Sequence, residues 1–315
     1  MRKTPADDAV ETPRIDAPGE GSRGSPRISR RQALRITAAF GTALLAGGAI
    51  STALLDAAGT RRRSSTRVRM ATPVTITVVH DDPAAADALI EATFAEIGRL
   101  EGIFTRHRPE SPLSVLARER VLRDAPSELI ELLHRSREFA VQSAGAFDVT
   151  IAPVLDLYRN RFAAGESMPA AGEVEEALSL VDYRSLELEG SVVSLNRPGM
   201  AVTLDGIAKG YIVDRALALL AAAGAGQVLV DAGGDMATSS GTGWEIAVQD
   251  PRNAKGSLGM VYLQGGGIAS SGDYLQAFTS DRSLHHILDP RTGRSPLHTS
   301  AVTIMAASAM EADAL

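Results

Sequence analysis

The sequence has no cysteine, and only three of its 315 residues are lysine. Without cysteine there is no disulfide scaffold, no thiolate zinc site, no cysteine nucleophile and no lipidated cysteine anchor. The hydrophobic fraction of 44% still supplies enough apolar material for one large domain or two modest ones. Lys3, Lys209 and Lys255 are the only lysines. A lysine inside a patterned segment is therefore a candidate for a specific role.

Several motifs of well-known enzyme classes are also missing. The sequence has no Gly-x-Ser-x-Gly elbow, no P-loop and no His-Glu-x-x-His helix. No Gly-x-Gly-x-x-Gly segment opens a helix after a strand, which disfavours a Rossmann dinucleotide site.

The formal charge of −6 divides unevenly along the chain. Residues 1–69 carry 13 basic and 6 acidic side chains, whereas residues 70–315 carry 19 basic and 32 acidic ones, a net charge of −13. An acidic main domain without a basic stripe is a poor nucleic-acid binder, because phosphate neutralisation dominates that affinity.

The first 69 residues have the order of an export signal. Residues 1–35 form a polar leader that ends in a twin-arginine pattern at Arg30 and Arg31, and residues 36–59 begin with twenty uncharged positions. The alternative is an uncleaved transmembrane anchor, because twenty apolar residues can just span a bilayer. Either hypothesis places the main domain outside the cytoplasm, close to the membrane. Residues 60–69 are basic, and we expect a solvated linker there, followed by the main domain over 70–315.

The main domain mixes helical and strand periodicity without a strict βαβ rhythm, which predicts an α+β fold with mixed sheets and packed helices. Predicted helices cover 84–100, 129–142, 173–180 and 207–223. Predicted strands cover 74–80, 227–231, 244–248, 260–263, 285–288 and 301–306, with a hairpin over 186–196.

Four segments combine glycine with aspartate, histidine or lysine in ways that packing alone does not require: 145–150, 203–210, 233–235 and 270–293. Lys209 stands beside the start of a predicted helix, where backbone N–H groups attract phosphate. The alternative is that Asp205 caps this helix and Lys209 is solvated. Gly233 and Gly234 fit a close ligand approach or a plain tight turn. If 285–288 is a strand, only one of His285 and His286 can face a given site.

Taken together and in order, six motifs resemble the FAD:protein FMN transferase family, also called the ApbE family. They are Ala-Phe-Asp at 146–148, Gly-Ile-Ala-Lys-Gly-Tyr at 206–211, Gly-Gly-Asp at 233–235, Ser-Gly-Asp-Tyr at 271–274, His-Ile-Leu-Asp-Pro-Arg-Thr-Gly at 286–293, and Ala-Asp-Ala at 312–314. The resemblance covers the whole of 70–315 and implies a single domain of two closely packed lobes.

The resemblance implies Mg²⁺-dependent transfer of FMN from FAD to a Ser or Thr hydroxyl of an acceptor protein. It implies Mg²⁺ ligands at the Gly206 carbonyl and the Asp313 carboxylate, and a phosphate-neutralising role for Lys209. His286 is the candidate base, with His285 as the fallback. The implied FAD contacts are Met70, Ala146, Phe147, Asp148, Thr203, Lys209 and Ile287.

The chain departs from the family pattern at three places. An acid that family members often carry at the position of Thr203 stands here at Asp205, and His107 replaces a frequent aromatic residue. The family usually has a Thr four residues after the metal-binding Asp, whereas this sequence stops at Leu315, two residues beyond Asp313. We therefore expect a shortened chain.

Two other functions are compatible with the sequence. One is an FAD pyrophosphatase, which would release FMN and AMP to water. The other is a non-catalytic flavin-binding protein at the cell surface, which would bind FAD without turnover.

Overall fold

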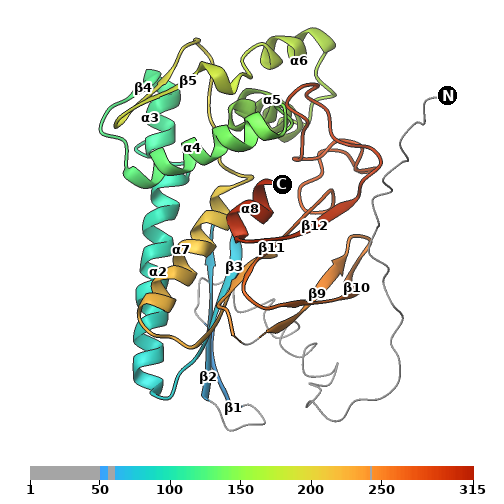
Figure 1. The fold of residues 1–315 in the computed structure, drawn as a ribbon. Helices are drawn as coiled ribbons and strands as arrows, with labels where there is room; N and C mark the ends of the chain where they lie inside the picture. The colour runs from blue at the N-terminus through green and yellow to red at the C-terminus, as the bar shows by residue number, and fades with distance from the viewer. Residues whose placement is uncertain (1–49, 56–60, 242) are drawn as a thin grey trace, which may run out of the picture. The chain divides into compact units, whose positions relative to one another are not determined.

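The computed structural model describes residues 50–55, 61–241 and 243–315, and it has the predicted α+β architecture (Figure 1). A seven-stranded sheet forms its centre, and all neighbouring strands in this sheet are antiparallel. In sheet order the strands are β1 (Ile50–Leu55), β2 (Arg61–Arg69), β3 (Thr72–Val79), β7 (Gln227–Ala232), β8 (Asp235–Thr238), β11 (Gly266–Gly272) and β12 (Ala301–Ala306).

Helices cover one face of this sheet and build a second layer above it (Figure 1). The described helices are α2 (Pro83–Phe104), α3 (Pro112–Glu119), α4 (Ser127–Gln142), α5 (Ala152–Ala163), α6 (Ala171–Leu178), α7 (Ala208–Ala222) and α8 (Ala309–Ala314). The remaining strands form the hairpin β9 (Trp244–Asp250) and β10 (Asn253–Leu263), and a small sheet of β4 (Val121–Leu122), β5 (Leu186–Glu189) and β6 (Val192–Leu195).

Helix α2 shows why the predicted helices form where they do. Asp82 precedes it and accepts a hydrogen bond from the Ala84 N–H at 2.8 Å, which satisfies one of the free donors of the first turn. Ile90, Phe94 and Ile97 recur on one face and are buried against the sheet. The main core lies at this interface of α2 and α7 with the sheet.

The segment Arg61–Arg69 is a strand, so its prediction as a linker was wrong. Ser65 and Thr66 are buried, and the Thr66 and Thr75 hydroxyls are hydrogen-bonded at 2.9 Å. Arg63 and Arg67 form ion pairs with Asp87 and Glu91 of α2. The positive charges of these arginines are thus paired with acidic side chains of a neighbouring helix. Local composition alone does not predict such pairing.

The predicted strand over 285–288 is absent as well. In the described chain His285 makes only an isolated bridge to Ala277, and the segment otherwise runs through bends and turns. Conversely, β11 was not predicted, because Gly266, Gly267 and Ser270 carry little strand signal. The other predicted helices and strands, including the hairpin around Gly190, are present in the structure.

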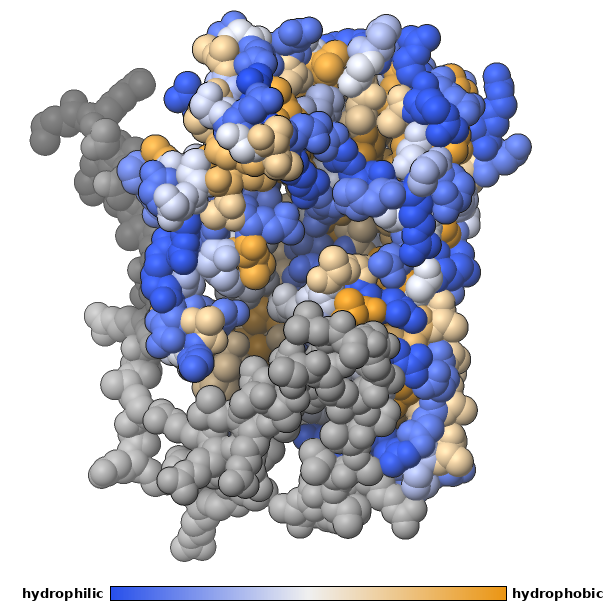
Figure 2. Space-filling model, turned by 180° about the vertical axis from the view of Figure 1, so that it is seen from behind, coloured by the Kyte–Doolittle hydropathy of each residue, from blue (hydrophilic) through white to orange (hydrophobic). Residues whose placement is uncertain are grey.

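The predicted leader and most of the predicted signal segment, residues 1–49 and 56–59, lie outside the described residues. Residues 50–55 of that segment pair with β2 as strand β1. Among the helices that the structure describes, none has both the length and the apolar character needed to cross a membrane. Hydrophilic residues cover much of the described surface on the face seen in Figure 2, interrupted by scattered apolar ones.

Candidate active site

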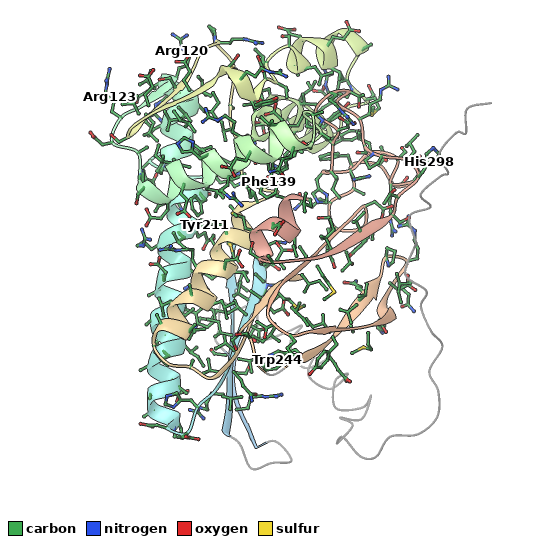
Figure 3. The ribbon with its side chains drawn as sticks, in the orientation of Figure 1. Arg120, Arg123, Phe139, Tyr211, Trp244 and His298 are labelled. Carbon is green, nitrogen blue, oxygen red and sulfur yellow. The ribbon has the colours of Figure 1, made fainter. Side chains whose placement is uncertain are left out.

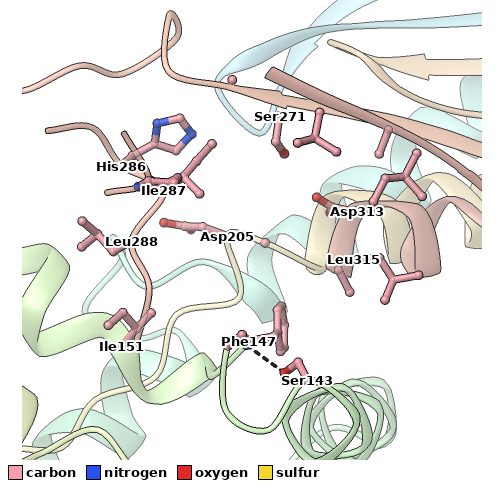
Figure 4. Close-up of a pocket in the computed structure, with 18 of the residues that line it drawn as sticks. Ser143, Phe147, Ile151, Asp205, Ser271, His286, Ile287, Leu288, Asp313 and Leu315 are labelled. Carbon is pink, nitrogen blue, oxygen red and sulfur yellow. Dashed lines mark hydrogen bonds between the residues drawn. The ribbon is translucent and has the colours of Figure 1, made fainter. Parts of the chain in front are cut away.

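A cavity of about 500 Å³ opens where the central sheet, α8 and the second helical layer meet (Figure 4). Its walls come mainly from five regions that are separate in the sequence: the segment after α4, the segment before α7, β11 with the residues after it, the loop 285–290, and the end of the chain from β12 to α8. All the predicted site residues except Met70 line this cavity.

Met70 lies elsewhere, so the structure does not bring it to the cavity with the others. It occupies the tight turn between β2 and β3 with a φ of 50°, and its backbone N–H donates to Glu101 at 3.0 Å. Its side chain packs against the main core.

Phe147 and its neighbours form an apolar wall of the cavity. The Phe147 ring meets Phe139 edge-on, with 6.1 Å between ring centroids, and its backbone N–H donates to Ser143 Oγ at 2.9 Å (Figure 4). The ring also lies against Gly206, where an added Cβ would be 3.6 Å away. This wall offers a flat ligand an aromatic contact on rigidly held backbone.

Asp148, although it borders the cavity, is engaged in holding the loop. It is 7% exposed and accepts hydrogen bonds from the Thr150 N–H at 2.8 Å, the Thr150 hydroxyl at 2.7 Å and the Tyr183 N–H at 2.9 Å. Burial raises the pKa of its carboxyl, and these hydrogen bonds oppose that shift. Its contribution is to fix the position of Ala146 and Phe147.

Asp205 does not cap the following helix, contrary to one of the two interpretations of this segment. Its side chain is half exposed and pairs with Arg159 at 3.3 Å. Helix α7 begins after Ile207, and the free N–H of Gly210 in its first turn donates to Asp313 at 3.0 Å. The cap therefore comes from a residue more than a hundred positions away, which no local pattern could reveal.

Lys209 and Asp313 are the charged residues of this part of the cavity lining, and Asp235 is buried beside Lys209. Lys209 Nζ lies 3.1 Å from Asp235 Oδ2, and its side chain is 26% exposed, so the solvated alternative does not hold. Burial alone would lower the pKa of Lys209, but Asp235 and Asp313 outweigh it and raise the pKa above its ordinary value. The lysine is a permanent cation at neutral pH.

Asp235 and Asp313 are close enough for the charge of one carboxyl to affect the pKa of the other. Burial and the neighbouring Asp313 carboxylate raise the pKa of Asp235 to about 8, against the opposing effect of Lys209. Burial also raises the pKa of Asp313. Two neighbouring buried carboxyls cannot both ionise without a large cost in free energy unless a cation lies between them.

Asp235 was missed as a site residue, although its turn was singled out. The Gly233 and Gly234 positions both have positive φ, and the Gly234 N–H donates to Asp231 at 3.2 Å. This geometry turns the chain sharply at the end of β7, so that β8 begins with Asp235 buried beside Lys209. The Gly-Gly-Asp pattern was the available signal.

Both His285 and His286 line the cavity, contrary to the expectation that only one of them could. The expectation assumed a regular strand, and the observed bends remove the alternation of faces. His285 is 1% exposed, whereas His286 is half-buried and points into the cavity opposite the α8 side (Figure 4). Burial lowers the pKa of both imidazoles, so each is neutral at neutral pH.

The donor set fits Mg²⁺ better than a transition metal. Within 50–55, 61–241 and 243–315, no group of three or more His, Asp or Glu side chains is placed to hold a metal ion. The site instead offers the Asp235 and Asp313 carboxylates and nearby backbone carbonyls such as that of Gly206. Mg²⁺ typically binds one or two carboxylates and completes its shell with water and substrate phosphates. The pKa values of Asp235 and Asp313 are both raised, and a cation bound beside them would relieve the repulsion between the two carboxylates.

Fold and cavity together define an α+β protein whose cavity combines an aromatic wall with a lysine and a carboxylate. The chain belongs to the ApbE family, whose profile matches residues 70–315. It is 30% identical over 284 residues to the FAD:protein FMN transferase of Treponema pallidum, covering 81% of this chain and 77% of that protein. It is 29% identical to the enzyme of the same name from Klebsiella pneumoniae, covering 79% of each.

The fold agrees with a solved member of the family. The structure is similar to the crystal structure of the ApbE protein from Thermotoga maritima, with a TM-score of 0.73 and 28% identity over 84% of each chain.

Proposed function

We propose that this ApbE-family enzyme transfers FMN from FAD to a Ser or Thr hydroxyl of an acceptor protein, with Mg²⁺, on the outer side of the cytoplasmic membrane. One observation carries the proposal. Lys209 and Asp313 lie together in the lining of a cavity that has an aromatic wall, and Asp235 is buried beside Lys209. Relatives that match most of this chain are named FAD:protein FMN transferase.

The proposed reaction exchanges one phosphorus–oxygen bond for another. The acceptor hydroxyl oxygen forms a bond to the phosphorus of the FMN half of FAD. The bond from that phosphorus to the bridging anhydride oxygen breaks, and AMP leaves with the bonding electrons. The hydroxyl proton passes to a base, so the products are the FMN phosphoester of the acceptor, AMP and a proton.

The chain's own charges explain why a cation is needed. The FAD pyrophosphate is anionic, yet the one ammonium group of Lys209 lies near three carboxyls, those of Asp235, Asp313 and Asp231. Asp313, Asp235 and the Gly206 carbonyl would hold Mg²⁺, which supplies positive charge to phosphate oxygens and polarises the anhydride. Lys209 adds a fixed positive charge beside them.

His286 is the proposed base for the acceptor hydroxyl. Its imidazole lines the cavity, and burial lowers its pKa, so the neutral form that accepts a proton predominates at neutral pH. His285, fully buried behind it, is the fallback.

The twin-arginine pattern at Arg30 and Arg31, followed by the apolar residues 36–55, supports the proposed location. A fusion of residues 1–60 to a reporter that is active only after export would test it. Replacing both arginines with lysine is expected to abolish export through the twin-arginine route.

The decisive experiment supplies FAD, Mg²⁺ and an acceptor domain carrying one target Thr, taken from a substrate of a related FAD:protein FMN transferase. We expect a fluorescent acceptor band that survives denaturation, with one AMP released per flavin attached. AMP without protein-bound flavin would instead support the pyrophosphatase, and FAD binding without AMP would support the carrier.

Two variants on the same helix sharpen this experiment. Asp313→Asn is expected to reduce the transfer rate by at least about 100-fold, because it removes a carboxylate that the cation needs. Glu311→Gln makes the same chemical change on α8 outside the cavity lining, and it should keep parental activity. Equal activity of the two variants would contradict the proposed role of Asp313.

A further inference from the structure

Helices α7 and α8 cap each other. Asp313 of α8 accepts the Gly210 N–H in the first turn of α7 at 3.0 Å. In return, Asp214 of α7 accepts the Ala309 and Met310 N–H groups in the first turn of α8, both at 2.8 Å. Each helix therefore places a carboxylate on the free donors of its partner.

Asp214 accepts more hydrogen bonds at the start of the short helix α8 than the helix's own cap does. The helix's own cap, Ser308, accepts only the Glu311 N–H, at 3.2 Å. Both oxygens of Asp214 are used on the preceding two N–H groups. Burial raises the pKa of Asp214, whereas these hydrogen bonds lower it. The hydrogen bonds therefore offset part of the cost of burying the charged carboxylate.

Gly210 makes this close approach possible. A Cβ at this position would lie 2.4 Å from the Ala309 carbonyl oxygen, a distance that no real contact allows. Gly210 and Asp214 are one helical turn apart on the same face of α7. One strip of α7 therefore fixes both the start of α8 and the carboxylate of Asp313.

We infer that Asp214 is a positioning residue for the metal site: it sets the orientation of α8 and, through it, the Asp313 carboxylate. The inference rests on the proposed function, because it concerns the cation that Asp313 would hold. Asp214 is not part of the cavity lining, so its effect on cation affinity is transmitted through the helix.

The test measures metal binding without catalysis. Mn²⁺ serves as the probe, and free Mn²⁺ is followed by electron paramagnetic resonance during titration of the full chain in the absence of FAD. Asp214→Asn keeps the size of the side chain but replaces one acceptor oxygen with a donor. We expect it to weaken Mn²⁺ binding about tenfold. Asp214→Glu keeps both acceptors but displaces them by a methylene, and we expect an intermediate loss.

A matched control separates positioning from general stability. Asp82 also caps a helix, accepting the Ala84 and Ala85 N–H groups of α2, but it lies outside the cavity lining. Asp82→Asn should leave Mn²⁺ affinity within twofold of the parent, even where thermal melts show that both Asn variants are equally destabilised.

The outcomes distinguish the two proposals. Parental Mn²⁺ affinity in the folded Asp214→Asn protein, or in Asp214→Glu should the Asn variant not fold, would overturn the positioning role and leave the proposed function intact. An equal loss in Asp82→Asn would also overturn it. A parent protein that binds no Mn²⁺ would overturn the metal site itself, and this inference with it.

Discussion

Residues 285 and 286 are both histidine, but the structure gives them different surroundings. His285 is sealed beneath the loop, its backbone N–H donating to Ser295 at 2.9 Å. His286 lies between this interior and the cavity, and its Nδ1 makes no hydrogen bond to any described residue. The His286 side chain is half-buried and points into the cavity, so its imidazole can reach the ligand space, whereas that of His285 is enclosed. The two histidines should therefore respond differently to substitution.

Replacing His286 with Ala should lower the rate constant for FMN transfer by about 100- to 10,000-fold, since that is the usual contribution of a general base. FAD affinity should change little. Because burial lowers the pKa of His286, the acid limb of the parent's pH–rate profile should fall below 6.5, the ordinary value for histidine. His298→Ala, at an exposed position away from the cavity, is the control (Figure 3). A parental profile in His286→Ala would exclude this base.

The site could be predicted from sequence only in part, for reasons visible at single residues. Lys209 stood out because lysine is so rare, and Asp313 followed from the family resemblance. Asp235 and Asp214 did not stand out, because their significance depends on partners about eighty to a hundred residues away. Met70 was expected beside FAD, whereas the structure packs its side chain against the main core, outside the cavity lining.

At the scale of secondary structure, periodicity predicted the long helices well, because one buried stripe defines each of them. Strand β2 was not predicted, because its sequence shows no comparable buried stripe. Its arginines read as solvated, but Arg63 and Arg67 lie along α2 beside acidic partners, and the Arg67 guanidinium stacks 4.5 Å from the Phe94 ring. Long arginine side chains can cover apolar surface while keeping their charge paired.

This strand predicts where the folded domain begins. A protein starting at Met70 would lack β1 and β2 and leave β3 as an exposed edge, which favours aggregation. A protein starting at Ile50 keeps both strands. We expect the shorter form to melt several degrees lower and to elute as aggregates in size-exclusion chromatography. Equal melting temperatures and monomeric elution of both would show that β2 is dispensable.

The hairpin of β9 and β10 is tied to the cavity by one ion pair. Arg252 in its turn contacts both oxygens of Asp273, at 2.6 and 2.7 Å, and the Ser300 hydroxyl at 2.6 Å. At the other end of the hairpin, Arg62 stacks on Trp244, with 4.7 Å to the ring centroid (Figure 3). The hairpin is thus held at both ends.

The hydrogen-bonded Arg252 lowers the pKa of Asp273 below 3.8, so the pair stabilises the fold above that pH and is lost as the pH falls through the lowered pKa. Asp273→Asn should lower the melting temperature at pH 7 by about 2–4 °C. The difference from the parent should shrink as the pH falls below 3.8 and through the lowered pKa. Glu245→Gln, an exposed position on β9, is the control. A difference that stays constant as the pH falls from 7 to 2 would show that charge pairing is not its cause.

At the scale of the whole molecule, the site joins the central sheet to the end of the described chain. The six-residue helix α8 packs against α7 and against β8, β11 and β12 of the sheet (Figure 1). A cation bound at Asp235 and Asp313 would therefore link the central sheet with the C-terminal helix. Binding to the folded state alone raises its stability by mass action.

Mg²⁺ at one hundred times its dissociation constant should stabilise the parent by about 2.7 kcal/mol, an increase in melting temperature of about 5–10 °C. Asp313→Asn should abolish the increase, and EDTA should reverse it in the parent. Calorimetry with and without Mg²⁺ measures both. An identical Mg²⁺ effect in the variant would place the cation elsewhere.

Because lysine is scarce in this chain, a reagent that modifies amines can report on the cavity. Lys255 is exposed on β10 and Lys3 lies outside the described residues, so Lys209 is the one amine known to sit inside the cavity. An amine-acylating reagent used at alkaline pH, where part of Lys209 is deprotonated, should therefore modify Lys255 at a steady rate and Lys209 mainly when the cavity is empty. The ratio of the two labelled peptides, read by mass spectrometry, becomes an internal gauge of ligand occupancy that requires neither fluorescence nor turnover.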